Sequence, residues 1–215
     1  MKRKNIRIIA LGSILLLAVA ITAQGGNRFG PQGLKGLSKA DQARLAKGEI
    51  IFSTETKNDE SKEGNALVEA TVVFDATPQE VWKLLYRTET QIRYLEEIEE
   101  VKLLKKEATE DLVQFKVGVA WIDVEYRVIH HFKPKDLSYR WELDKSYKSD
   151  LVALQGYWHF YPYGNGKTLG RYGSNVSVKN VPSFIEAMFK KNGVKKALRA
   201  VRRYINSKGT WRCSR

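Results

Sequence analysis

The sequence LVEATVVFDATPQEVWKLL at residues 67–85 predicts a strand that leads directly into a helix. Apolar residues recur at every second position up to Phe74, which is the period of a strand with one buried face. Thr77 can then cap a helix, and Pro78 suits the first helical position. The apolar side chains of this helix are Val81, Trp82 and Leu85.

Downstream, a second short helix is expected around Ile92 and Leu95, followed by a series of alternating segments. The connections at 133–136 and 164–167 are short and rich in turn residues, which favours antiparallel hairpins over parallel crossovers. The expected strand segments are 101–104, 113–121, 124–128, 139–143, 152–160 and 170–178.

After Pro182 the apolar period returns to 3.6, which predicts a single helix of about 25 residues. Its apolar stripe must be buried, and the concave face of the sheet is the available surface. The predicted fold is therefore α+β: a curved antiparallel β-sheet wrapped around a long C-terminal α-helix, with two short helices after the first long strand. The stripe consists of Val194, Leu198, Val201 and Ile205.

Residues 1–23 have the features of a secretory signal peptide. Four bases occur by residue 7, an apolar stretch runs from Ile8 to Ala23, and Ala18-Val19-Ala20 fits a cleavage site. The alternative is an uncleaved anchor, although the stretch is shorter than the roughly 20 residues that span a bilayer comfortably. Both interpretations place the folded domain outside the cytoplasm, in the periplasm or secreted, and an uncleaved N-terminal segment would tether it to the membrane.

The remaining chain divides into three parts. Residues 24–48 begin as a glycine-rich tether and end in a short helix, which Ser38 can cap and Gly48 can terminate. Residues 49–208 form the expected ligand-binding domain, and residues 209–215 form a basic tail.

The charge is concentrated at the two ends of the chain. The 215 residues carry a formal charge of +13, of which residues 1–23 contribute +4 and residues 187–215 contribute +10, leaving 24–186 at −1. The body of the protein therefore lacks the basic surface of a nucleic-acid-binding domain. The hydrophobic content of 43% argues against disorder, and the single Cys213 excludes an intramolecular disulfide.

Three motifs carry a resemblance to a known superfamily: Ala76–Trp82 after the first long strand, Gly156–Pro162 on a late strand, and Val181-Pro182 before the last helix. Together with the order of elements from Glu49 to Ser207, they resemble the START-like helix-grip superfamily, in its polyketide cyclase or coenzyme Q-binding branch. The chain departs from the branch in having Arg87-Thr88 where Asp is frequent and Leu95-Glu96 where Pro is frequent.

The resemblance implies a cavity between sheet and C-terminal helix that holds a lipid, an isoprenoid or quinone, or a polyketide-like molecule. We expect binding by a monomer without a cofactor, and lipid transfer or handling at a membrane is a role that such binding would serve. The alternative is a cyclase or aromatase, which needs an ionisable group inside the cavity. Each inward aromatic can equally be an ordinary core residue. The candidate ligand-binding residues are Phe115, Trp121, Tyr126, Trp141, Trp158, Phe160, Tyr172 and Met188. Gly156 and Gly170 are expected to leave room near them.

Two further patterns concern metals and membranes. His130 and His131 are adjacent, so on a strand they face opposite sides and cannot readily bind one ion, and no metal site is expected. The bases of the last helix lie away from its apolar stripe, as an ordinary solvated face or as a contact for anionic lipid headgroups. These candidate membrane-contact residues are Lys191, Lys195, Arg199, Arg202 and Arg203.

Overall fold

The computed structural model describes residues 28–53, 67–119, 122–178 and 191–214. In this part of the chain, eight strands form one antiparallel sheet with the order β1-β2-β8-β7-β6-β5-β4-β3. From β3 to β8 every strand pairs with its neighbour in the chain, whereas β2 pairs with β8. The strands are β1 (Ile51–Phe52), β2 (Val68–Phe74), β3 (Ile98–Lys106), β4 (Glu110–Val119), β5 (Ile122–Lys133), β6 (Ser138–Leu143), β7 (Leu151–Tyr163) and β8 (Lys167–Val178).

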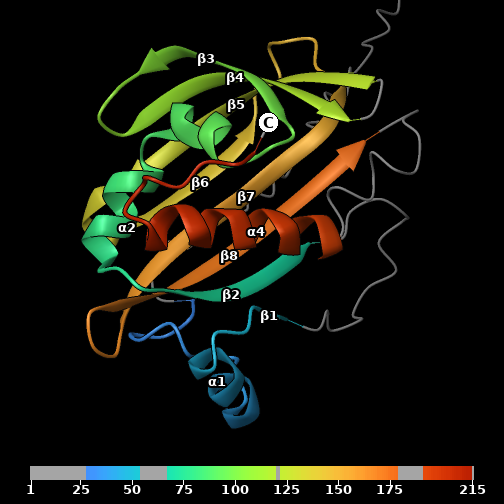
Figure 1. The fold of residues 1–215 in the computed structure, drawn as a ribbon. Coiled ribbons are helices and arrows are strands. Elements are labelled where there is room, and N and C mark those ends of the chain that lie inside the picture. The colour runs from blue at the N-terminus through green and yellow to red at the C-terminus, as the bar shows by residue number, and fades with distance from the viewer. Residues whose placement is uncertain (1–27, 54–66, 120–121, 179–190, 215) are drawn as a thin grey trace, which may run out of the picture.

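The helices lie along one face and one edge of this sheet (Figure 1). The C-terminal helix crosses one face, with α2 and η1 beside it at one end, and α1 lies beyond the edge formed by β1 and β2 (Figure 1). The described helices are α1 (Lys39–Ala46), α2 (Pro78–Leu85), the 3-10 helices η1 (Thr88–Arg93) and η2 (Pro134–Asp136), and α4 (Lys191–Asn206). The predicted helix-grip fold is confirmed.

Helix α2 begins where the sequence predicts, because Thr77 and Glu80 form a capping box. Thr77 Oγ1 accepts a hydrogen bond from the Glu80 N–H, and the Thr77 N–H donates to Glu80 Oε2 at 2.8 Å. At α1, Ser38 Oγ likewise accepts from the Asp41 N–H at 3.0 Å. The second short helix is a 3-10 helix that ends at Arg93, so Leu95 lies beyond it.

The main core lies between α4 and the sheet. All four residues of the predicted apolar stripe of α4 are between 0 and 8% exposed. They pack in one cluster with Phe74 of β2, Trp158 and Phe160 of β7, and Val81 of α2. The predicted length of about 25 residues cannot be compared directly, because residues 179–190 lie outside the described part and α4 has 16 described residues.

The opposite face of the sheet is covered near β7 and β8 by residues 28–37, part of the stretch expected to be a flexible tether. Phe29 is only 4% exposed, and the guanidinium of Arg171 lies 4.0 Å from the centre of its ring. Gly33 packs so closely against Tyr161 that a Cβ atom would collide with the ring, and its φ of +72° also favours glycine. The side chains of this segment therefore bind it to the domain.

The predicted signal peptide at residues 1–23 lies outside the described residues. Within the described ranges, none of the helices combines the length and the apolar character needed to cross a bilayer.

Candidate functional site

A cavity of about 240 Å³ lies between the inner face of the sheet and α4. Strands β4 to β8 supply most of its wall, α4 lies across it, and η1 with the start of β3 closes one side. Most of the lining is aromatic or aliphatic, as is common for cavities that hold apolar ligands. Residues that illustrate this wall are Leu95, Ile98, Val117, Val128, Leu154, Val176 and Leu198.

Five of the eight predicted ligand-binding residues line this cavity: Phe115, Tyr126, Trp141, Trp158 and Tyr172. Phe160 does not line it, because its side chain is buried in the core, with its ring centre 6.5 Å from that of Phe74. The alternation of β7 places Phe160 on the inner face but beyond the end of the cavity. Trp121 and Met188 lie outside the described residues.

The two glycines expected to leave room in the cavity instead accommodate aromatic rings. A Cβ atom on Gly156 would collide with the indole of Trp141, and one on Gly170 would collide with Phe74 and Trp158. The space released by each missing side chain is therefore filled by a neighbouring ring. The cavity instead occupies the space between α4 and the inner face of β4 to β8.

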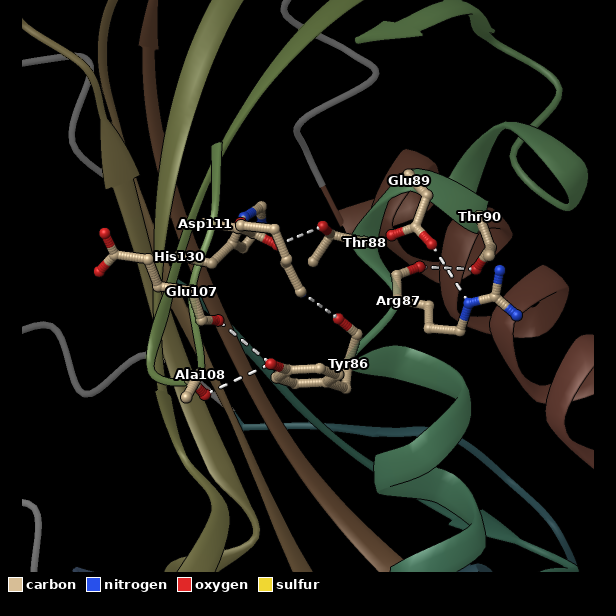
Figure 2. Close-up of polar contacts among 10 residues, drawn as sticks. Tyr86, Arg87, Thr88, Glu89, Thr90, Glu107, Ala108, Asp111 and His130 are labelled. Carbon is tan, nitrogen blue, oxygen red and sulfur yellow. Dashed lines mark hydrogen bonds and ion pairs between the residues drawn. The ribbon is translucent and has the colours of Figure 1, made fainter. Parts of the chain in front are cut away.

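A buried polar cluster stands at the cavity wall, centred on Asp111 of β4 (Figure 2). Asp111 is fully buried, and His130 of β5 is 4% exposed, with its Nδ1 2.6 Å from Asp111 Oδ1. Asp111 Oδ2 accepts hydrogen bonds from Thr88 Oγ1 at 2.6 Å and from Lys106 Nζ at 3.0 Å. Of these four residues, His130 is the one that lines the cavity.

The contacts of Asp111 determine which nitrogen of His130 carries a proton. Burial raises the pKa of the Asp111 carboxyl, but the hydrogen bonds from His130, Thr88 and Lys106 outweigh it, so that the pKa lies below its usual value. The carboxylate is thus ionised at neutral pH and can only accept hydrogen bonds. His130 Nδ1 must therefore be the donor, and the ring is oriented with a fixed tautomer in its neutral form.

Tyrosine hydroxyls add further polar groups to the cavity. Tyr94, Tyr126, Tyr139 and Tyr172 all line it, and burial raises the pKa of each phenol. They therefore remain protonated at neutral pH and can donate a hydrogen bond to a ligand oxygen. Tyr94 is further fixed by stacking on Tyr204 of α4, with ring centres 4.3 Å apart.

The two adjacent histidines face opposite sides of β5, as predicted. His130 faces the cavity, whereas His131 Nε2 lies 3.0 Å from Glu142 Oε1 on the other face. Among the described residues, no group of three His, Cys, Asp or Glu side chains is arranged to hold a metal ion.

The sequence interpretation missed Asp111 and His130 as a cavity pair. Asp111 has the same parity as Val113, Phe115 and Val117, the inward residues of β4. His130 in the same way continues the inward series of Tyr126 and Val128 on β5. Extending the alternation by one step on each strand would have indicated that both side chains point inward.

The bases of α4 have different environments. Arg199 and Arg203 are exposed and Lys195 is half-buried, while Arg202 Nη1 donates to the carbonyl oxygen of Gly48 at 2.5 Å. Lys191 belongs to α4, but its side chain lies outside the described part. The exposed bases thus include two of the five candidate membrane-contact residues.

Comparison with solved structures shows the same fold in proteins of low sequence identity. The Zhui aromatase/cyclase from Streptomyces sp. R1128 matches with a TM-score of 0.58 and 16% identity, over 67% of this chain and 95% of that one. A STAR-related lipid transfer protein from Xanthomonas axonopodis matches with 0.57 and 15%, over 73% and 98%. A START superfamily protein from Mycobacterium smegmatis matches with 0.56 and 15%, over 67% and 99%. At these identities the likeness establishes the fold.

A search of the curated proteins finds no match to the sequence. The model of one protein family, described as polyketide cyclase / dehydrase and lipid transport, matches residues 65–205. This match spans about two thirds of the chain and includes strands β2 to β8, α2, η1 and η2, all but the last residue of α4, and the cavity residues described above. The chain therefore belongs to the polyketide cyclase / dehydrase and lipid transport family, and it has the helix-grip fold that the sequence predicts.

Proposed function

We propose that this protein binds a hydrophobic small molecule, of the lipid, isoprenoid, quinone or polyketide-like class, in the cavity between the sheet and α4. The observation that carries the proposal is the cavity of about 240 Å³ with its mainly aromatic and aliphatic lining. Membership of a family that includes lipid transport proteins supports it. The protein acts as a monomer and needs no cofactor or nucleic acid for this activity.

Native mass spectrometry of the purified protein, followed by organic extraction, tests the proposal. We expect a reproducible co-purifying apolar molecule in the wild type. Ala197→Phe places a ring in the cavity that Ala197 lines and should release this molecule, whereas Ala200→Phe on the same helix, outside the cavity lining, should retain it. Equal occupancy in the two variants would argue against binding in this cavity.

The second candidate function is catalysis of a cyclisation and dehydration of a polyketide-like substrate. The favouring observation is His130, an ionisable group in the cavity wall that is held by the buried carboxylate of Asp111. The assay is incubation with a linear poly-β-ketone thioester, with mass spectrometry to detect a product that has lost water. Loss of water that is unchanged in His130→Phe would exclude His130 as the catalytic group.

We further propose that α4 contacts an anionic membrane surface through Lys191, Lys195, Arg199, Arg202 and Arg203. The exposure of Arg199 and Arg203 supports this, because bases near an anionic surface each contribute about 1 kcal/mol in favour of binding. Flotation with phosphatidylglycerol and phosphatidylcholine vesicles is the assay. Reversal of Arg199 and Arg203 to Glu should abolish binding to the anionic vesicles. Reversal of the exposed Lys133 at the end of β5 and Lys135 in η2 changes the net charge equally and should not abolish binding.

The membrane contact takes place outside the cytoplasm, because residues 1–23 act as an export signal that is cleaved or retained as an anchor. Fractionation of cells that express the full chain, compared with a chain that lacks residues 2–23, measures export. The intact mass of the exported protein distinguishes cleavage from anchoring. Equal recovery of both chains from the cytoplasm would contradict the proposal.

A further inference from the structure

The His130 side chain presents one ring nitrogen to the cavity and the other to the protein. Nδ1 is engaged by the Asp111 carboxylate at 2.6 Å. Among the described residues, Nε2 takes part in no hydrogen bond, although His130 lines the cavity. His130 Nε2 is thus a polar atom of a buried, cavity-lining side chain, and no described residue of the lining forms a hydrogen bond with it.

The ring is held on several sides, so that the direction of Nε2 is fixed. Phe132 stacks on it with ring centres 6.1 Å apart and an angle of 17°, and Tyr139 meets it edge-on at 6.1 Å. Trp141 lies at 6.5 Å on the neighbouring strand. With Nδ1 attached to Asp111 as well, rotation of the ring would break a buried hydrogen bond and these contacts.

The second oxygen of the Asp111 carboxylate has partners of its own. Lys106 Nζ lies 3.0 Å from Asp111 Oδ2, and Thr88 Oγ1 donates to the same oxygen at 2.6 Å. Asp111 Oδ1 is thereby directed at His130 Nδ1. In the neutral ring, with Nδ1 protonated, Nε2 is an acceptor with a lone pair.

The other polar side chains of the wall can all donate a hydrogen bond, except Glu97. The hydroxyls of Tyr94, Tyr126, Tyr139, Tyr172 and Ser174 and the amide of Gln91 can serve a carbonyl or ether oxygen, and their oxygens can also accept. The carboxylate of Glu97, which also lines the cavity, is already paired with Lys196 Nζ at 2.8 Å. In the neutral ring, His130 Nε2 is the nitrogen acceptor of the described lining, and it can accept but not donate.

We propose that His130 Nε2 is a recognition site for a hydroxyl group on the ligand, and that the cavity selects alcohols, phenols or enols over the corresponding hydrocarbons, ethers and ketones. Asp111, Thr88 and Lys106 position the acceptor, and the aromatic wall binds the apolar remainder of the ligand. This inference rests on the proposed ligand binding and names the chemical class of the ligand.

Three bicyclic probes separate the two proposals: naphthalene, 2-naphthol and 2-methoxynaphthalene, titrated against the wild type by quenching of tryptophan fluorescence. Binding of naphthalene tests the cavity alone, because this probe has no polar group. We expect 2-naphthol to bind about tenfold more tightly than the methyl ether, the size of one net hydrogen bond. The methyl ether cannot donate to Nε2.

The variant pair His130→Phe and His131→Phe assigns this preference to a residue. Phe keeps an aromatic ring at position 130 but has no acceptor. The ratio of the Kd of 2-methoxynaphthalene to that of 2-naphthol should therefore fall to about one, while naphthalene still binds. His131 faces away from the cavity, so His131→Phe should bind all three probes as the wild type does. A preference that survives in His130→Phe and is lost in Tyr126→Phe would overturn the proposal.

Nitrogen NMR of the wild type provides a test that does not depend on a variant that folds. The chain has three histidines, so the ring nitrogens can be assigned with few variants. We expect the His130 Nε2 resonance to shift on addition of 2-naphthol and to remain nearly unchanged on addition of the methyl ether. If naphthalene binds but the hydroxyl confers neither a preference nor a shift, the inference fails and the proposed function stands. If no probe binds, both fail.

Discussion

Asp111 connects β4 to three other secondary-structure elements through a single side chain, and its removal should be far more costly than that of a surface carboxylate. In Asp111→Ala, the His130 Nδ1 loses its acceptor at 2.6 Å, and Thr88 Oγ1 loses its own at 2.6 Å. Breaking a buried pair by removal of one partner costs about 3–5 kcal/mol. The Lys106 side chain is 28% exposed, so water can solvate its ammonium group when the carboxylate is absent. We therefore expect the free energy of unfolding to fall by an amount at the lower end of this range, about 3 kcal/mol.

Urea unfolding followed by tryptophan fluorescence measures this cost. With a slope of roughly 2 kcal/mol per molar urea for a domain of this size, the midpoint should fall by about 1.5 M. The control is Asp123→Ala, which removes an exposed carboxylate that pairs with Lys116 at 2.7 Å. Water screens that pair, so the midpoint should hardly change. Equal shifts in the two variants would refute the view that Asp111 organises the cavity wall.

Two further predictions concern pH and packing. Because the pKa of Asp111 is lowered in the folded protein, its stabilising contribution should be complete above about pH 4, the value of an unfolded Asp, and be lost as the pH falls through the lower folded pKa. The urea midpoints of the wild type and of Asp111→Asn should therefore converge in acid, and a constant difference would contradict this. Gly156→Ala should destabilise the fold by about 1–3 kcal/mol, because its Cβ atom collides with an indole and with a backbone carbonyl. In Gly118→Ala the new Cβ atom contacts only the end of the Glu99 side chain, which can move away, so this control variant should lose less thermal stability. A similar loss in both variants would argue against the prediction.

Local signals were sufficient to predict most of the fold. Thr77, Pro78 and Glu80 lie within four consecutive residues, so the start of α2 could be predicted without any tertiary information. The stripe on α4 repeats at helical spacing, and burial of its four residues follows from that pattern. The packing of Phe29 against Arg171 could not be predicted in this way, because it joins distant parts of the chain and the surrounding glycines indicate flexibility.

The residues that line the cavity could not be predicted from one sequence alone. An inward aromatic side chain can line a cavity, as Trp158 does, or fill the core, as Phe160 does two residues later on the same strand. The difference arises from the position of α4 above the sheet, which no local pattern determines. The Asp111–His130 pair similarly depends on the register of β4 against β5, in which these two residues are direct partners.

The strand order also has a consequence for synthesis of the chain. Strands β3 to β8 can pair successively as they leave the ribosome, but β2 finds its long partner only when β8 is made, because Phe74 pairs with Thr168. During that interval an apolar strand has no neighbour except the two-residue β1. Unpaired apolar strands of this kind are aggregation-prone. The nascent chain is therefore most exposed to aggregation before β2 pairs with β8. Mutations that weaken this pairing should reduce the yield of folded protein more than its final stability.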